Sequence, residues 1–231
     1  MNPGIYFDTL DGIVRQKELA VISQNLSNLS TPGYKRERIA FQKYFFSVIE
    51  NRKTDFSKGD LRHTGNTFDL AISGKENVFF VVRSADGKEL YTRRGDFCIG
   101  NDKKLMTVNG FFVQGRSGDI TVNGRRIEIN KEGEVIVDGK VVDKLRLVSV
   151  PTETLVRYGR TMFYAKNTQN IKPAKDYEIL QGYLETSNVK PVEEMIRIVD
   201  CLRNYEICQK SIQSHDEITS RLINDVGIVR A

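Results

Sequence analysis

The chain has no tryptophan and, among its 231 residues, only two histidines and three cysteines. His63 and His215 belong to no HExxH, catalytic-triad or CxxC pattern, which argues against the common zinc and hydrolase sites. Cys98, Cys201 and Cys208 are odd in number and form no CxxC pair, so they do not indicate a disulfide framework. We therefore predict no catalytic residue, no metal site and no cofactor.

Long apolar runs and an excess of one charge are also lacking. No segment reaches the roughly twenty apolar residues of a membrane-spanning helix, and the start, MNPGIYFDTLDG, lacks the pattern of a cleaved secretory signal. The chain has 35 basic and 30 acidic residues, for a net charge of +5, and most basic residues are close in sequence to an acidic one. Such mixing is weak evidence for nucleic-acid binding. We expect neither membrane insertion nor a nucleic-acid partner.

Proline is scarce, and between Pro191 and Val226 the chain has no glycine and no further proline. Apolar and small residues recur there at heptad spacing, with His215 and Thr219 continuing the series, which predicts a helix of roughly 50 Å with one contact face. We expect this face to form an assembly interface. Its members are Ile198, Cys201, Tyr205, Cys208, Ile212, Leu222 and Val226.

A second helix is predicted at the amino end, with Asn2 as cap and Pro3 at the first helical position. It should end near Ser30, because Pro32 disfavours helical geometry at Thr31. Polar residues such as Lys17 interrupt its apolar face, so we expect both terminal helices to be frayed in the free chain and to order on assembly. The predicted interface residues of this helix are Phe7, Leu10, Val14, Val21, Asn25 and Asn28.

The middle of the chain has short β-branched and aromatic runs separated by turn dipeptides, at Asp86-Gly87, Asn109-Gly110, Asn123-Gly124 and Asp138-Gly139. These are hairpin patterns, and no helical period interrupts them, which disfavours a parallel sheet. The predicted fold class is α+β, with long terminal helices forming a coiled-coil-like terminal domain around a central antiparallel β domain. Its expected parts are a helix and turn over 1–35, a connector over 36–58, the β domain over 59–180, and over 181–231 a helix that pairs with the first.

Three blocks of sequence resemble the flagellar rod and hook protein family. The first is NLSNLSTPGYK at residues 25–35, whose turn comprises Thr31, Pro32, Gly33 and Tyr34. The second is GDLRHTGNTFDLAI at 59–72, followed by Phe79-Phe80 and by YTRRGDF at 91–97. The third is QGYLETSNVKPVEEM at 181–195. The blocks occur in the family's order and span nearly the whole chain.

The resemblance implies a structural subunit of the bacterial flagellar basal-body rod, which self-assembles through its terminal helices into a helical tube and transmits torque from motor to hook. Implied partners are other copies, further rod and hook subunits and the flagellar export apparatus. The implied location is the periplasmic rod, reached by type III export without a cleaved signal. The short connector and the absence of a large inserted domain favour the proximal rod subunit, with the distal rod or hook subunit as the alternative.

Two readings from other classes stay open. The first is a basic nucleic-acid-binding β protein with a coiled-coil dimerisation tail, which a pI near 9.0 permits. The second is an enzyme whose site the β domain assembles around His63 or Asp69 from residues scattered in the sequence.

Overall fold

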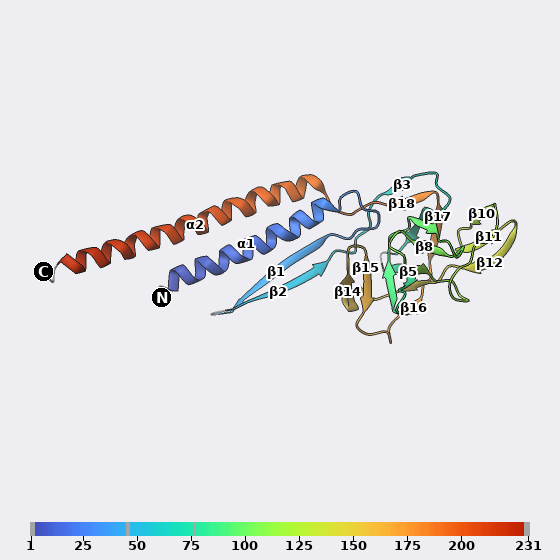
Figure 1. Cartoon of the computed structure of the whole chain (residues 1–231), viewed down its shortest axis with the longest axis horizontal. Coiled ribbons are helices and arrows are strands. Elements are labelled where there is room, and N and C mark those ends of the chain that lie inside the picture. Colours follow the sequence, from blue (N-terminus) through green and yellow to red (C-terminus); the bar gives the residue numbers. More distant parts are fainter. Residues whose placement is uncertain (1–2, 45–46, 76, 229–231) are drawn as a thin grey trace. The chain divides into compact units, whose positions relative to one another are not determined.

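The structure, a computed structural model, describes residues 3–44, 47–75 and 77–228 (Figure 1). Its contacts divide the chain into two compact units. The helical unit comprises residues 1–27, 37–53 and 190–231, and the β unit comprises residues 28–36 and 54–189. The cap predicted at Asn2 lies outside the described residues.

The helical unit is built on two antiparallel helices, α1 (Pro3–Ser27) and α2 (Pro191–Ile228), which lie side by side (Figure 1). Strands β1 (Glu37–Tyr44) and β2 (Ser47–Thr54) form a two-stranded sheet, and β1 contacts α1. Segment 36–58, expected to be a connector, thus contains two strands. The first turn of α2 carries Glu193 and Glu194, where negative charge favours the helix dipole.

Antiparallel strands make up the β unit. Its largest sheet has nine strands, in the order β14-β15-β6-β5-β9-β8-β7, with β13 beside β5 and β16 beside β13. Smaller sheets pair β10-β11-β12, β17-β4 and β18-β3, and a short 3-10 helix covers Thr152–Thr154. The strands are β3 (Leu61–His63), β4 (Leu70–Gly74), β5 (Val78–Arg83), β6 (Glu89–Thr92), β7 (Phe97–Ile99), β8 (Leu105–Thr107), β9 (Phe112–Val113), β10 (Ile127–Ile129), β11 (Glu134–Val137), β12 (Lys140–Lys144), β13 (Leu147–Ser149), β14 (Leu155–Tyr158), β15 (Met162–Ala165), β16 (Lys172–Pro173), β17 (Tyr177–Gln181) and β18 (Tyr183–Glu185).

The predicted fold class is therefore confirmed: the two terminal helices pack together and flank a central antiparallel β region in the sequence. Three turn dipeptides join paired strands as predicted, between β5 and β6, β8 and β9, and β11 and β12. At the last of these, Asp138 and Gly139 have φ of 51° and 82°, as a two-residue type I′ turn requires.

The hairpin predicted at Asn123-Gly124 is wrong, because the flanking strands β9 and β10 belong to different sheets. Gly124 instead packs close to the side chains of Val137 and Asp138, and the Asp138 carboxylate accepts hydrogen bonds from the backbone N–H groups of Arg125 and Arg126. A tertiary contact thus determines the conformation of this dipeptide.

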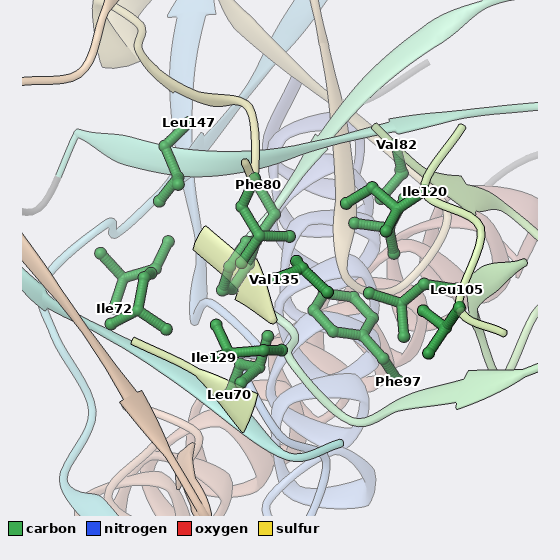
Figure 2. Packing of buried hydrophobic residues seen from close by; sticks show 14 of the residues in the cluster. Leu70, Ile72, Phe80, Val82, Phe97, Leu105, Ile120, Ile129, Val135 and Leu147 are labelled. Atoms are coloured by element: carbon green, nitrogen blue, oxygen red, sulfur yellow. The ribbon is translucent and has the colours of Figure 1, made fainter. Parts of the chain in front are cut away.

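The β unit has two apolar clusters. The larger contains Phe80, Phe97 and Leu105, which Figure 2 shows among their neighbours. The Phe80 and Phe97 rings meet edge to face, with their centroids 5.2 Å apart. The second cluster contains Phe79 and Phe163. Alternate residues of β5 enter different clusters, which explains why its run VFFVVR is buried almost throughout.

Candidate functional site

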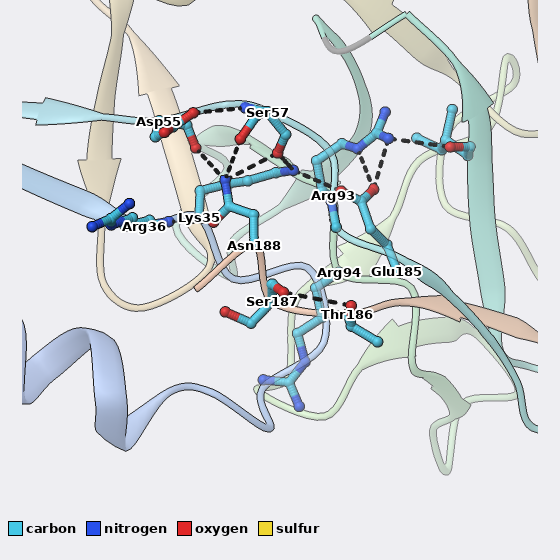
Figure 3. A network of polar contacts seen from close by, with 12 residues as sticks. Lys35, Arg36, Asp55, Ser57, Arg93, Arg94, Glu185, Thr186, Ser187 and Asn188 are labelled. Atoms are coloured by element: carbon cyan, nitrogen blue, oxygen red, sulfur yellow. Dashed lines mark hydrogen bonds and ion pairs between the residues drawn. The ribbon is translucent and has the colours of Figure 1, made fainter. Parts of the chain in front are cut away.

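The three sequence blocks that resemble the rod and hook family meet in a buried ion-pair network of the β unit (Figure 3). Lys35 comes from the first block, Arg93 from the second and Glu185 from the third. The Lys35 Nζ lies 2.6 Å from Glu185 Oε1, and an Arg93 nitrogen lies 2.7 Å from Glu185 Oε2. All three side chains are at most 1% exposed, so the network lies away from water.

Each charge in this network has further partners. Arg93 donates hydrogen bonds to the backbone oxygens of Val78 and Ile72, at 2.7 and 3.1 Å. Lys35 donates to the backbone oxygen of Ser57 at 2.6 Å. Burial alone would raise the pKa of Glu185, but Arg93 and Lys35 outweigh it and hold this pKa below its ordinary value. Glu185 is therefore a carboxylate at neutral pH, and the network is a structural tie, since its groups are enclosed.

The turn of the first block packs tightly beside the network. Gly33 has φ of +64°, and a Cβ added to it would lie 2.5 Å from the backbone nitrogen of Arg94, so only glycine fits here. Its N–H donates to the Glu185 backbone oxygen at 2.8 Å. Arg157 lies over the ring of fully buried Tyr34 at 5.0 Å and donates to the Lys35 backbone oxygen. The turn motif is thus packed into the β unit.

Asn188 extends the network on the side of the third block. Its side-chain oxygen accepts the backbone N–H of Arg36 at 2.7 Å, and its amide nitrogen donates to the backbone oxygens of Asp55 and Ser57 at 2.8 and 3.0 Å (Figure 3). One side chain therefore ties together three segments that are distant in sequence.

Asn25 plays the corresponding part in the helical unit. This fully buried side chain exchanges two hydrogen bonds of 2.9 Å with the backbone of Glu37 and donates to Glu194 at 3.3 Å. Glu194 is itself fully buried. The end of α1 and the starts of β1 and α2 are thereby held together, and a shift of either helix would leave buried polar groups without partners.

The facing sides of α1 and α2 also carry polar contacts. Cys201 is buried and its thiol donates to the Arg15 backbone oxygen at 3.1 Å; burial raises the pKa of this thiol. Further along, Ser211 donates to Asp8 at 2.6 Å. The heptad face of α2 is thus largely occupied by α1 of the same chain.

The predicted interface residues fall into several groups. Val14, Val21, Asn25 and Cys201 are buried in the helical unit, and Asn28 is buried in the β unit. Leu10, Ile198, Tyr205, Cys208 and Ile212 are half-buried, whereas Phe7 and Leu222 are exposed at 48% and 60%. The side chain of Val226 lies outside the described residues. In the turn, Thr31 and Pro32 are half-buried and Gly33 and Tyr34 are buried.

Sequence reasoning missed a second apolar face on α2, made of exposed residues in its first three turns. The spacing that reveals it, at positions 192, 195, 196, 199 and 202, is present in the sequence. Sequence reasoning also missed the ion-pair network, whose members are charged residues of the three motif blocks.

In the part of the chain that the structure describes, histidines, cysteines and carboxylates form no group of three that could hold a metal ion. Among the described helices, none is both long enough and apolar enough to cross a membrane. A cleft of about 200 Å³ between α1 and α2, lined partly by Leu19 and Tyr205, is below the usual size of a ligand pocket.

Three family models match the chain. They are described as Flagella basal body rod protein, at residues 13–35, Flagellar hook protein FlgE/F/G D1 domain, at residues 71–137, and Flagellar basal body rod FlgEFG protein C-terminal, at residues 180–225. Their order follows that of the three sequence blocks.

Similar proteins span almost the whole chain. Flagellar basal-body rod protein FlgF of Buchnera aphidicola subsp. Schizaphis graminum is 30% identical, covering 95% of this chain and 96% of the relative. FlgF of Salmonella typhimurium is also 30% identical, over 87% and 89%. Flagellar basal-body rod protein FlgG of Buchnera aphidicola subsp. Acyrthosiphon pisum is 28% identical, over 96% and 99%.

Proposed function

Because the chain belongs to the flagellar basal-body rod protein family, we propose that it builds a helical tube by packing its terminal helices against those of neighbouring subunits. Membership makes it a structural, non-enzymatic subunit of the rod that assembles with other rod subunits.

The observation that supports helical assembly is the unequal length of the paired helices. α2 has 38 residues and α1 has 25, and near the end of α2 Ile218, Leu222 and Ile223 are 52% to 67% exposed. Each such side chain gains on the order of 1 kcal/mol when a partner covers its exposed half. Neighbouring subunits would supply that cover.

The predicted interface residues then have two roles. Those buried or half-buried in the helical unit hold α1 and α2 together and so shape the surface that neighbours meet. Phe7 and Leu222 are exposed and contact neighbouring subunits directly. Contacts between different faces of identical subunits propagate into a helical tube, and closely packed helices would make it stiff enough to transmit torque from motor to hook.

We place the subunit in the proximal rod. The chain is short, with only residues 28–60 between α1 and β3, and the described residues form two compact units without a further large domain. Relatives named FlgF and FlgG match it at similar identity, so the distal rod or hook subunit is the second candidate. The partners proposed beyond rod subunits are hook subunits and the flagellar export apparatus, and the proposed route is type III export of an uncleaved chain into the periplasmic part of the rod.

Deleting the gene and imaging purified basal bodies by electron microscopy tests this function. A proximal rod subunit predicts a truncated shaft without a hook, restored by the wild-type gene. A full-length rod lacking only the hook would indicate a hook subunit, and intact basal bodies with hooks would overturn the proposal.

A further inference from the structure

The first three turns of α2 carry large apolar side chains on the side away from α1. Five residues recur every three or four positions and therefore share one face. This outer stripe consists of Val192, Met195, Ile196, Val199 and Leu202, which are 67%, 58%, 57%, 48% and 44% exposed. Leu202 stands at the edge of the stripe and also lines the cleft between α1 and α2.

The outer stripe is distinct from the face that packs on α1. At 3.6 residues per turn, Val199 lies about 160° around the helix axis from Cys201, and Cys201 is the residue buried against Arg15. This part of α2 therefore carries exposed apolar side chains on the side opposite the one that packs on α1, whereas a helix that covers a single core needs only one such face.

The outer stripe has defined limits. It spans 11 residues, or about 16 Å of helix, and the same face becomes charged from Arg203 onward, through Glu206, Lys210 and Glu217. Glu193 and Asp200 lie beside it and are exposed. An apolar centre with a charged rim is the usual composition of a protein interface.

We propose that the outer stripe is the docking face for the helical unit of a second copy of this chain, an inference that rests on the function proposed above. A subunit that adds repeatedly must present two different, complementary faces. The exposed side of α1 supplies such a complement, with Ile13 at 45% exposure and the small residues Ala20, Ser23 and Ser27 at near-heptad spacing. Large side chains on one helix pack into the space that small ones leave on another.

A photo-crosslinking residue at position 199 tests the contact in isolated basal bodies. We expect irradiation to give an adduct with the mass of two copies of this chain, and no such adduct from the dilute monomer. Absence of the two-copy adduct in basal bodies that contain the probe-bearing chain, or its equal yield from the monomer, would overturn the inference.

The variant Val199→Asp gives an independent test. Because Val199 is 48% exposed, the purified variant should keep the helix content and melting temperature of the wild type. Its copies per basal body should fall by more than about tenfold, since a charge would be buried on docking. A variant that folds and incorporates like the wild type refutes the docking face alone, whereas a wild-type chain missing from basal bodies refutes the proposed function.

If Val199→Asp is unstable, Val199→Ser supplies a milder change with the same expected direction. Ser23→Trp, on the exposed side of α1, should lower incorporation as well by filling the space needed for the stripe. Normal incorporation of folded Ser23→Trp would exclude that side of α1 as the complement and so contradict the proposed pairing.

Discussion

Lys35 and Glu185 stand 150 positions apart in the chain and form an ion pair of 2.6 Å with both side chains buried. With Arg93, they join segments from both ends of the chain to the middle of the β unit. The β unit is therefore complete only when residues 28–36 and 181–189 are both in place.

Glu185→Gln should lower the free energy of unfolding of the β unit by about 3–5 kcal/mol. The substitution keeps the shape of the side chain but removes the negative charge that both buried cations, Lys35 and Arg93, contact. Denaturant unfolding followed by tyrosine fluorescence measures the loss. Glu89→Gln is the matched control, because Glu89 pairs with Arg146 at the surface with both side chains 43% exposed, and should cost less than about 1 kcal/mol. Equal losses in the two variants would refute the structural role of the network.

Stability should fall in acid as buried carboxylates gain protons. Burial alone would raise the pKa of Asp119, but hydrogen bonds from Gln114, Lys104 and Arg83 lower it from 3.8 to about 2. A carboxyl whose pKa is lower in the folded state stabilises the protein above its unfolded-state pKa, and this contribution is lost as the pH falls through the folded-state value. The free energy of unfolding should thus drop between pH 4 and about pH 2, and Asp119→Asn should make that drop shallower. An unchanged slope in Asp119→Asn would contradict the assignment.

Gly33→Ala should destabilise the β unit by more than the roughly 1–2 kcal/mol that a left-handed backbone costs an alanine. The extra loss comes from the contact that the new Cβ would make with the Arg94 backbone nitrogen. Gly110→Ala isolates the backbone cost, since Gly110 has φ of +84° and open space around its Cβ position. Thermal unfolding of both variants compares them, and a smaller effect at Gly33 than at Gly110 would show that the turn does not require close packing.

Asn25→Ala should cost about 1–3 kcal/mol, because it leaves the Glu37 backbone groups buried without their partner. The lost stability should affect the helical unit. The far-ultraviolet circular dichroism signal of its helices should therefore disappear at a lower temperature than in the wild type. Ser23→Ala, two residues earlier and exposed, is the control and should have little effect. Equal melting temperatures of Asn25→Ala and the wild type would show that the Asn25 hydrogen bonds do not stabilise the helical unit.

The sequence was most informative where local patterns decide the structure. The helical periods over α1 and α2 predicted both helices, and dipeptides such as Asp138-Gly139 predicted turns that need φ above zero. Segment 36–58 gave no clear pattern, because charged and apolar residues mix in ERIAFQKY and SVIENRKT, and its strands β1 and β2 depend on pairing with each other.

The ion-pair network could not be predicted from spacing, since contacts such as Lys35 with Glu185 leave no local period. The resemblance to the rod and hook family identified the three blocks that contain its members, but it did not show that these residues contact one another. The outer stripe differs in kind, because its spacing is visible in the sequence. The heptad pattern describes only the face that contains Cys201. Val199 lies on the opposite side of the helix and is part of another apolar face.

The most direct measurement is amide hydrogen exchange of the chain as a dilute monomer and in isolated basal bodies. If the terminal helices are completed by neighbouring subunits, α2 from Pro191 to about Asn224 should exchange much more slowly in the basal body, with the largest change beyond residue 215. Strand β5, already buried within the chain, should show no comparable change. Equal protection of α2 in the two states would contradict assembly through the terminal helices.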